Sequence, residues 1–148
     1  MQIINQSIQY QMETSTGNTD SVVVGLHGKT DKLEFSANLT IVADDLEAGT
    51  TFDDLSKKQL SALAIKKLPK LMPTLAYSNY QFFVQNDAPV RLTAYSDISN
   101  NGNYISLSST FDQSDFKDKT IGSIGYEDVK SAVKTILTQE FPTSSTKA

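Results

Sequence analysis

The chain has 148 residues, no cysteine, one histidine and a net charge of −4. This length fits one domain of ordinary size. The missing cysteines exclude disulfides, thiolate nucleophiles and cysteine-based zinc sites, and the acidic balance argues against a nucleic-acid-binding protein, which usually carries a basic surface.

The N-terminal residues 1–7 have neither the basic region nor the apolar region of a signal peptide. No apolar run approaches the roughly 20 residues that are needed to cross a bilayer. We therefore expect a soluble, cytoplasmic protein that has no contact with a membrane.

The first part of the chain predicts three strands, over residues 2–13, 21–28 and 33–41. The third has the clearest pattern, because five apolar residues alternate with four polar residues from Leu33 to Ile41. Such alternation places one face of a strand on the core and the other in water. Turn-forming residues separate the strands at 14–20 and 28–31.

A helix is predicted over residues 52–68. Thr51 is its expected N-cap, with Asp54 as the partner three residues further on. Pro69 should end or kink this helix, because its ring clashes with the carbonyl four residues earlier. The inner stripe of the helix consists of Leu60, Leu63, Ala64, Leu68 and Leu71.

The second part predicts strands over residues 80–84, 90–99 and 104–111. Asn100 to Asn103 contains the Asn-Gly pair that a two-residue type I′ turn favours, so the last two strands should form a hairpin. A second helix is predicted over residues 126–141, where Pro142 stops it. We expect one domain over residues 1–142 and a flexible tail over residues 143–148.

These elements indicate an α+β fold, with an antiparallel sheet of five or six strands and two helices packed on one face. Strands followed by an acidic segment and a helix occur twice, which suggests a βββα–βββα arrangement. Residues 51–55 also resemble residues 125–129. The alternative is that acidic helix starts look alike because carboxylates favour the helix N-terminus.

The aromatic residues of the second part are the candidate interaction surface. Phe82 and Phe83 are neighbours in a predicted strand, so one of them must point away from the core. An exposed aromatic of this kind suits a contact surface, while a sheet packed on both sides would bury it. The candidate residues are Tyr80, Phe82, Phe83, Tyr95 and Tyr104.

Other polar groups do not form a recognisable site. His27 has no partner that would orient it as a general base. The acids at 112–118 lack the spacing, the glycine and the final glutamate of a calcium loop. The lysines of the first helix indicate a solvated face, since the chain has a single arginine. We predict no cofactor and no metal, and assign no catalytic residue.

Three functions remain open. We favour a non-enzymatic interaction or assembly protein that binds a protein partner or associates with itself. The alternative is a small-ligand-binding domain with an apolar pocket between sheet and helices, which needs roughly 300 Å3 or more. The third is an enzyme that uses buried carboxylates. The composition gives an impression of a bacterial or phage accessory protein, but it identifies no family.

Overall fold

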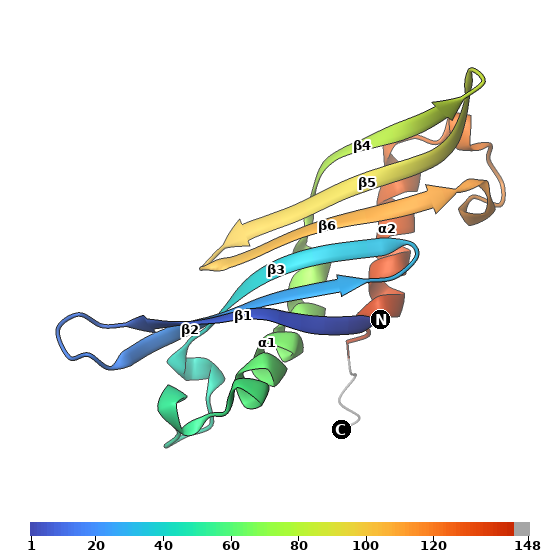
Figure 1. The fold of residues 1–148 in the computed structure, drawn as a ribbon. Coiled ribbons are helices and arrows are strands. Elements are labelled where there is room, and N and C mark those ends of the chain that lie inside the picture. The colour runs from blue at the N-terminus through green and yellow to red at the C-terminus, as the bar shows by residue number, and fades with distance from the viewer. Residues whose placement is uncertain (144–148) are drawn as a thin grey trace.

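Six strands form one antiparallel sheet in a computed structural model that describes residues 1–143. The spatial order is β1-β2-β3-β6-β5-β4 (Figure 1). This confirms the predicted α+β fold, with the larger of the two expected strand numbers. The strands are β1 (Gln2–Met12), β2 (Thr19–Lys29), β3 (Leu33–Ile41), β4 (Ala76–Gln85), β5 (Ala88–Asn100) and β6 (Asn103–Asp112).

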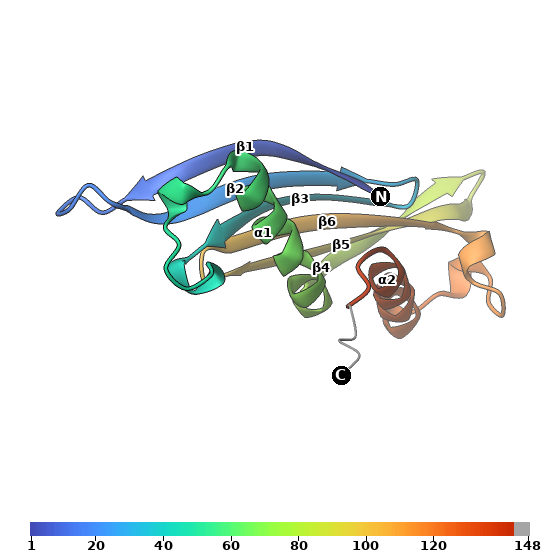
Figure 2. The same ribbon diagram turned by 90° about the horizontal axis from the view of Figure 1, so that it is seen from below.

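Two helices of equal length, α1 (Lys57–Leu71) and α2 (Tyr126–Glu140), lie on the same face of the sheet (Figure 2). The opposite face, here called the open face, has no helix over it. Within residues 1–143, neither helix has the length and apolar character that a bilayer span requires. Five short 3-10 helices complete the fold: η1 (Ala43–Asp45), η2 (Phe52–Asp54), η3 (Met72–Thr74), η4 (Gln113–Asp115) and η5 (Ile121–Ser123).

The element order is a structural repeat. Three strands, two 3-10 helices and one α-helix occur first over β1 to α1 and again over β4 to α2. β3 and β6, the third strand of each repeat, pair with each other in the middle of the sheet. The first strand of each repeat, β1 or β4, therefore forms an outer edge.

The buried positions of the two repeats correspond closely. In the first repeat, alternate residues of β2 and β3 are buried, and the helix buries every fourth residue. The second repeat buries the same positions of β5, β6 and α2. The helical pairs are Leu60 and Val129, Ala64 and Val133, Leu68 and Leu137, and Met72 and Phe141.

The second repeat nevertheless has polar residues at three of the core positions where the first has leucine. Ser96, Asn103 and Ser109 are the buried polar residues among those described. By strand position they correspond to Leu26, Leu33 and Leu39. Asn103 has a structural task, because its side-chain oxygen accepts a hydrogen bond from the Thr40 N–H at 3.1 Å. Replacement of leucine by serine removes volume from the core.

The hairpin at Asn100 to Asn103 is confirmed. Asn101 and Gly102 both have positive φ, 47° and 75°, as a type I′ turn requires. A second turn of this kind, which the sequence analysis did not identify, joins β4 to β5. Its central residues Asn86 and Asp87 have φ values of 51° and 62°.

The predicted start of the first helix, at residue 52, is wrong. Thr51 and Asp54 do pair as a capping box, since the Asp54 carboxylate accepts the Thr51 N–H at 2.9 Å, but this pair caps the start of η2. A second capping box, Ser56 with Gln59, begins α1 five residues later. Two capping boxes thus follow each other along the chain: the first begins η2, and the second begins α1.

Pro69 does not end α1. It lies in the last turn, and the helix continues to Leu71 before η3 begins. The missing N–H and the ring of Pro69 affect the hydrogen bond to the carbonyl of Ile65, one turn earlier, so the residues after the proline can still be helical. The matched residues 51–55 and 125–129 are also not equivalent, because the first segment forms η2 and the second begins α2. Of the predicted tail, residues 144–148 lie outside the described residues.

Candidate functional site

The five candidate aromatic residues divide between the two faces of the sheet. Tyr80 and Phe82 pair with Ala94 and Leu92 on the helix side and pack partly against the core. Their rings lie edge to face, with centroids 6.0 Å apart. Phe83, Tyr95 and Tyr104 occupy the open face, where Phe83 and Tyr104 are about half exposed.

The register separates the three aromatic residues of the open face. Phe83 is opposite Arg91, whose guanidinium lies 5.0 Å from the ring centre. Tyr95 lies four residues further along β5, and Tyr104 is paired with Ser99 another four residues on. At about 3.4 Å per residue, each step covers roughly 14 Å. On β5, Thr93 and Asp97 occupy the open-face positions between them.

The two edge strands carry no charged side chain. β1 reads QIINQSIQYQM and β4 reads AYSNYQFFVQ, without Asp, Glu, Lys, Arg or Pro. Each of the four inner strands contains at least one charged residue. Among residues 1–143, neither edge strand has a backbone hydrogen bond to another element on its outer side. Exposed large apolar residues on these strands are Ile4, Tyr10, Met12, Phe83 and Val84.

The acidic residues at positions 44–45 and 112–118, which an enzyme using carboxylates would need in a buried site, have structural partners or lie in solvent. Asp45 and Asp115 accept backbone N–H groups at the start of η1 and η4, and they pair with Lys67 and Lys32. Asp112 accepts the Ser114 N–H at 2.8 Å. Asp44 and Asp118 are exposed. Within the described part of the chain, no carboxyl group is buried.

Hydrogen bonds hold the pKa values of several of these carboxyls low. Burial alone would raise the pKa of Asp45, but the bonds from Lys67 and the Val42 N–H outweigh it, so the pKa lies below its ordinary value. The Ser114 hydroxyl and N–H lower the pKa of Asp112. The bond from Lys119 lowers the pKa of Asp128. These carboxylates are therefore held in the charged form.

His27 lies on the open face. Its Nδ1 is 3.4 Å from Ser36 Oγ, and its Nε2 is 3.7 Å from Glu34. The described residues contain no group of three or more histidine or acidic side chains that could hold a metal ion. On α1, Lys67 donates to Asp45 and to the Thr40 carbonyl, both at 2.8 Å. Part of the lysine cluster thus serves to fix the helix to the sheet.

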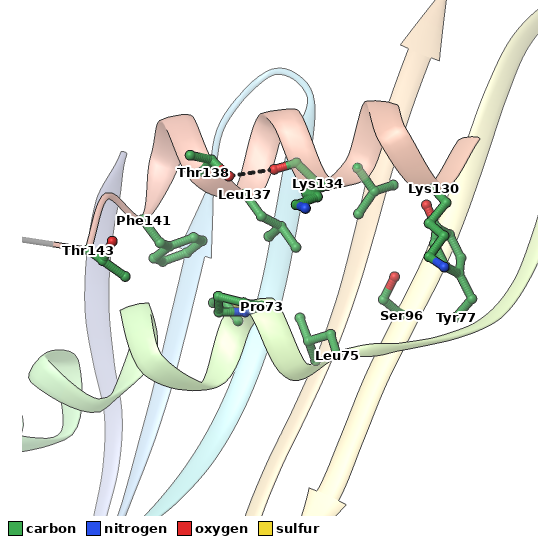
Figure 3. A pocket seen from close by; sticks show the side chains of 12 residues that line it. Pro73, Leu75, Tyr77, Ser96, Lys130, Lys134, Leu137, Thr138, Phe141 and Thr143 are labelled. Carbon is green, nitrogen blue, oxygen red and sulfur yellow. Dashed lines mark hydrogen bonds between the residues drawn. The ribbon is translucent and has the colours of Figure 1, made fainter. Parts of the chain in front are cut away.

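A hollow of about 450 Å3 lies between α2, η3 and the strands β4 and β5 (Figure 3). We call it the α2 groove. Side chains of α2 form one side and Pro73 and Leu75 form the other, with Ser96 and Tyr77 between them. Its lining is Met72, Pro73, Leu75, Tyr77, Ser96, Lys130, Val133, Lys134, Leu137, Thr138, Phe141 and Thr143.

The residues of the α2 groove were not predicted from the sequence. One signal was present: Ser96 interrupts the apolar alternation of Leu92 and Ala94 at an inward position. The lysines of α2 gave no signal, because their position beside the hollow depends on how the helix packs.

Comparisons with protein-family models, with curated proteins and with solved structures found no match to this chain.

Proposed function

We propose that this chain is a non-enzymatic assembly protein that associates with copies of itself through its edge strands. The observation that carries the proposal is the absence of charge on β1 and β4, the two strands that have a free side. Sheet edges offer a row of unpaired N–H and C=O groups to any other strand. A protein that stays monomeric normally protects such edges.

The usual protection consists of lysine or proline in the edge strand, a short strand, or a covering helix or loop. β1 has eleven residues and β4 has ten, and neither contains lysine or proline. Each strand has two bulge-like register shifts, which give partial protection: between Asn5 and Ser7 and between Gln11 and Met12 in β1, and between Tyr77 and Asn79 and between Phe83 and Val84 in β4. Charge is found instead on the inner strands, where it has no bearing on edge pairing.

The chemistry of the edges suits pairing between copies. Two β1 strands can pair antiparallel about a two-fold axis, so that the same residues contribute from both copies. Exposed Ile4, Tyr10 and Met12 would then be partly covered. Burial of such apolar surface adds to the stability of the backbone hydrogen bonds.

The test is the mass of the protein in solution, measured by light scattering over a range of concentrations. We expect about twice the chain mass of 16.2 kDa or more. The variants Gln9→Lys and Gln81→Lys each place a charge in the middle of one edge strand. One of these variants lies in the edge strand that forms the interface between copies. That variant should raise the dissociation constant of the oligomer roughly tenfold or more, because the lysine would lose its water in the interface.

Gln139→Lys is the matched control, since it makes the same change at an exposed position of α2. It should leave the mass unchanged. A wild-type protein that remains at 16.2 kDa at every concentration would refute self-association. If the wild type and the three lysine variants all have the same mass, and this mass exceeds that of one chain, the proposed role of the edge strands is refuted.

A further inference from the structure

The α2 groove lies where the second repeat has a smaller core side chain than the first. In the first repeat, Leu26 fills the core position of β2, and in the second repeat the corresponding residue of β5 is Ser96. Ser96 lines the groove together with Val133 and Leu137 of α2. The missing leucine side chain therefore contributes directly to the hollow.

The groove is apolar, with a few polar groups. Six lining residues have hydrocarbon or thioether side chains: Met72, Pro73, Leu75, Val133, Leu137 and Phe141. Its volume of about 450 Å3 lies within the range of roughly 300–1,000 Å3 that small-molecule sites show. Met72, Val133, Leu137 and Phe141 are already buried, so an apolar ligand of modest size would mainly cover the carbon surface that Pro73 and Leu75 leave in water.

The charge of the groove is positive, although the whole chain has a net charge of −4. Lys130 and Lys134 both line it and lie one helical turn apart on α2. No carboxylate is among the lining residues. Within the described residues, neither lysine takes part in an ion pair, whereas Lys32, Lys67 and Lys119 are all paired with aspartates.

Tyr77 adds no negative charge to the groove. Its hydroxyl donates a hydrogen bond to the Val129 carbonyl at 2.7 Å. Burial, with a smaller contribution from Tyr126, raises the pKa of Tyr77 well above its usual value. The phenol is thus neutral at physiological pH and does not repel an anion.

We propose that the α2 groove binds a small single-chain amphiphile, whose apolar chain lies against Leu75, Val133 and Phe141 and whose carboxylate lies near Lys130 and Lys134. The combination of apolar lining, two uncompensated ammonium groups and no carboxylate selects this class. The ligand is taken up free from solution. This site is separate from the edge strands and does not depend on self-association.

The test is titration with dodecanoate below its micelle concentration, measured by calorimetry and by chemical shifts of α2. Dodecyltrimethylammonium has the same chain with the opposite charge, and acetate has the head without the chain. We expect binding of dodecanoate that weakens as salt is added, and at least tenfold weaker binding of the other two.

Ser96→Leu restores the residue type of the first repeat, and it should fill the groove and weaken dodecanoate binding at least tenfold. Ser99→Leu makes the same change on the open face of the same strand and should leave binding unchanged. Lys130→Gln and Lys134→Gln should each weaken binding about threefold, with exposed Lys58→Gln as the control.

Several results would overturn the proposal. They are equal binding of the two charged amphiphiles, full binding by a folded Ser96→Leu variant, and no dodecanoate binding by the wild type. Binding of an acidic amphipathic peptide without binding of dodecanoate would also overturn it, because the groove would then be a peptide site. Light scattering of the same samples separates these outcomes from any failure of self-association.

Discussion

Four aspartates have the same role at the residue scale. Asp45, Asp54, Asp115 and Asp128 each occupy the third position of a helical turn and accept the backbone N–H of the residue three positions before. This arrangement satisfies an N–H that the turn leaves without a partner. Only Asp54 was predicted in this role from the sequence, and Asp115 was considered as part of a calcium loop, because the hydrogen bonds of these acids depend on the local turn.

Asp45→Asn tests the charge of such a residue, since asparagine can still accept the Val42 N–H. The folded-state pKa of Asp45 lies below the unfolded value of 3.8, so its stabilising effect is fully present above that pH. The effect is lost as the pH falls through the lower, folded-state pKa. We expect a loss of about 1 kcal/mol or less at pH 7, measured by urea unfolding.

The difference between wild type and Asp45→Asn should shrink as the pH falls from 3.8 to the lower folded-state pKa, because the carboxyl of the unfolded chain takes up a proton first. Asp44→Asn is the control, because Asp44 is exposed and has no hydrogen-bonded partner among the described residues. Equal stability of the two variants at pH 7 would show that the bond to Lys67 contributes nothing.

At the scale of the elements, the two hairpin turns show how far local sequence predicts the conformation of a turn. Asn101-Gly102 was predictable because glycine takes a positive φ at no steric cost. Asn86-Asp87 adopts the same geometry without glycine and was missed. The start of α1 was misplaced because either capping box could begin a helix, and the packing of Leu60 and Ala64 against the sheet decides between them.

Asp87→Gly should stabilise the protein by about 0.5 kcal/mol, because it removes the cost of a positive φ at a residue with a Cβ. The measurement is the midpoint of urea or thermal unfolding. Gly102→Ala is the reverse change in the other hairpin and should cost about 1 kcal/mol or more. A Cβ at Gly102 would also lie 2.9 Å from Thr40 Oγ1. Destabilisation by Asp87→Gly would contradict this account.

The repeat is the main feature of the whole molecule. Its order of strands and α-helices could be predicted, because hairpin signals and amphipathic helices are local patterns of the sequence. The α2 groove could not be predicted in the same way. It depends on the position of α2 relative to η3, which results from contacts between residues far apart in the chain, such as Tyr77 with Val129.

Phe141→Ala tests whether the repeats act as one cooperative unit. Phe141 of the second repeat packs edge to face on Phe35 of the first, with ring centroids 5.6 Å apart. Its loss should cost about 3–5 kcal/mol. Hydrogen exchange should then show equal loss of protection in β2 and β5, because the β3–β6 pairing joins the two halves.

Tyr126→Ala, at the other end of α2, is the comparison, because Tyr126 is about half exposed. Its cost should be clearly smaller. If Phe141→Ala reduces protection in β5 alone, the halves unfold separately.

If copies pair through their edge strands as proposed, each copy has two places for pairing, β1 and β4. A pair joined at β1 still presents two β4 strands, so the number of subunits is limited only if the second side is blocked or its geometry forbids contact. A closed pair has a mass that reaches a plateau with concentration. A ribbon that continues to add subunits at β4 has a mass that keeps rising, and would grow as one continuous sheet.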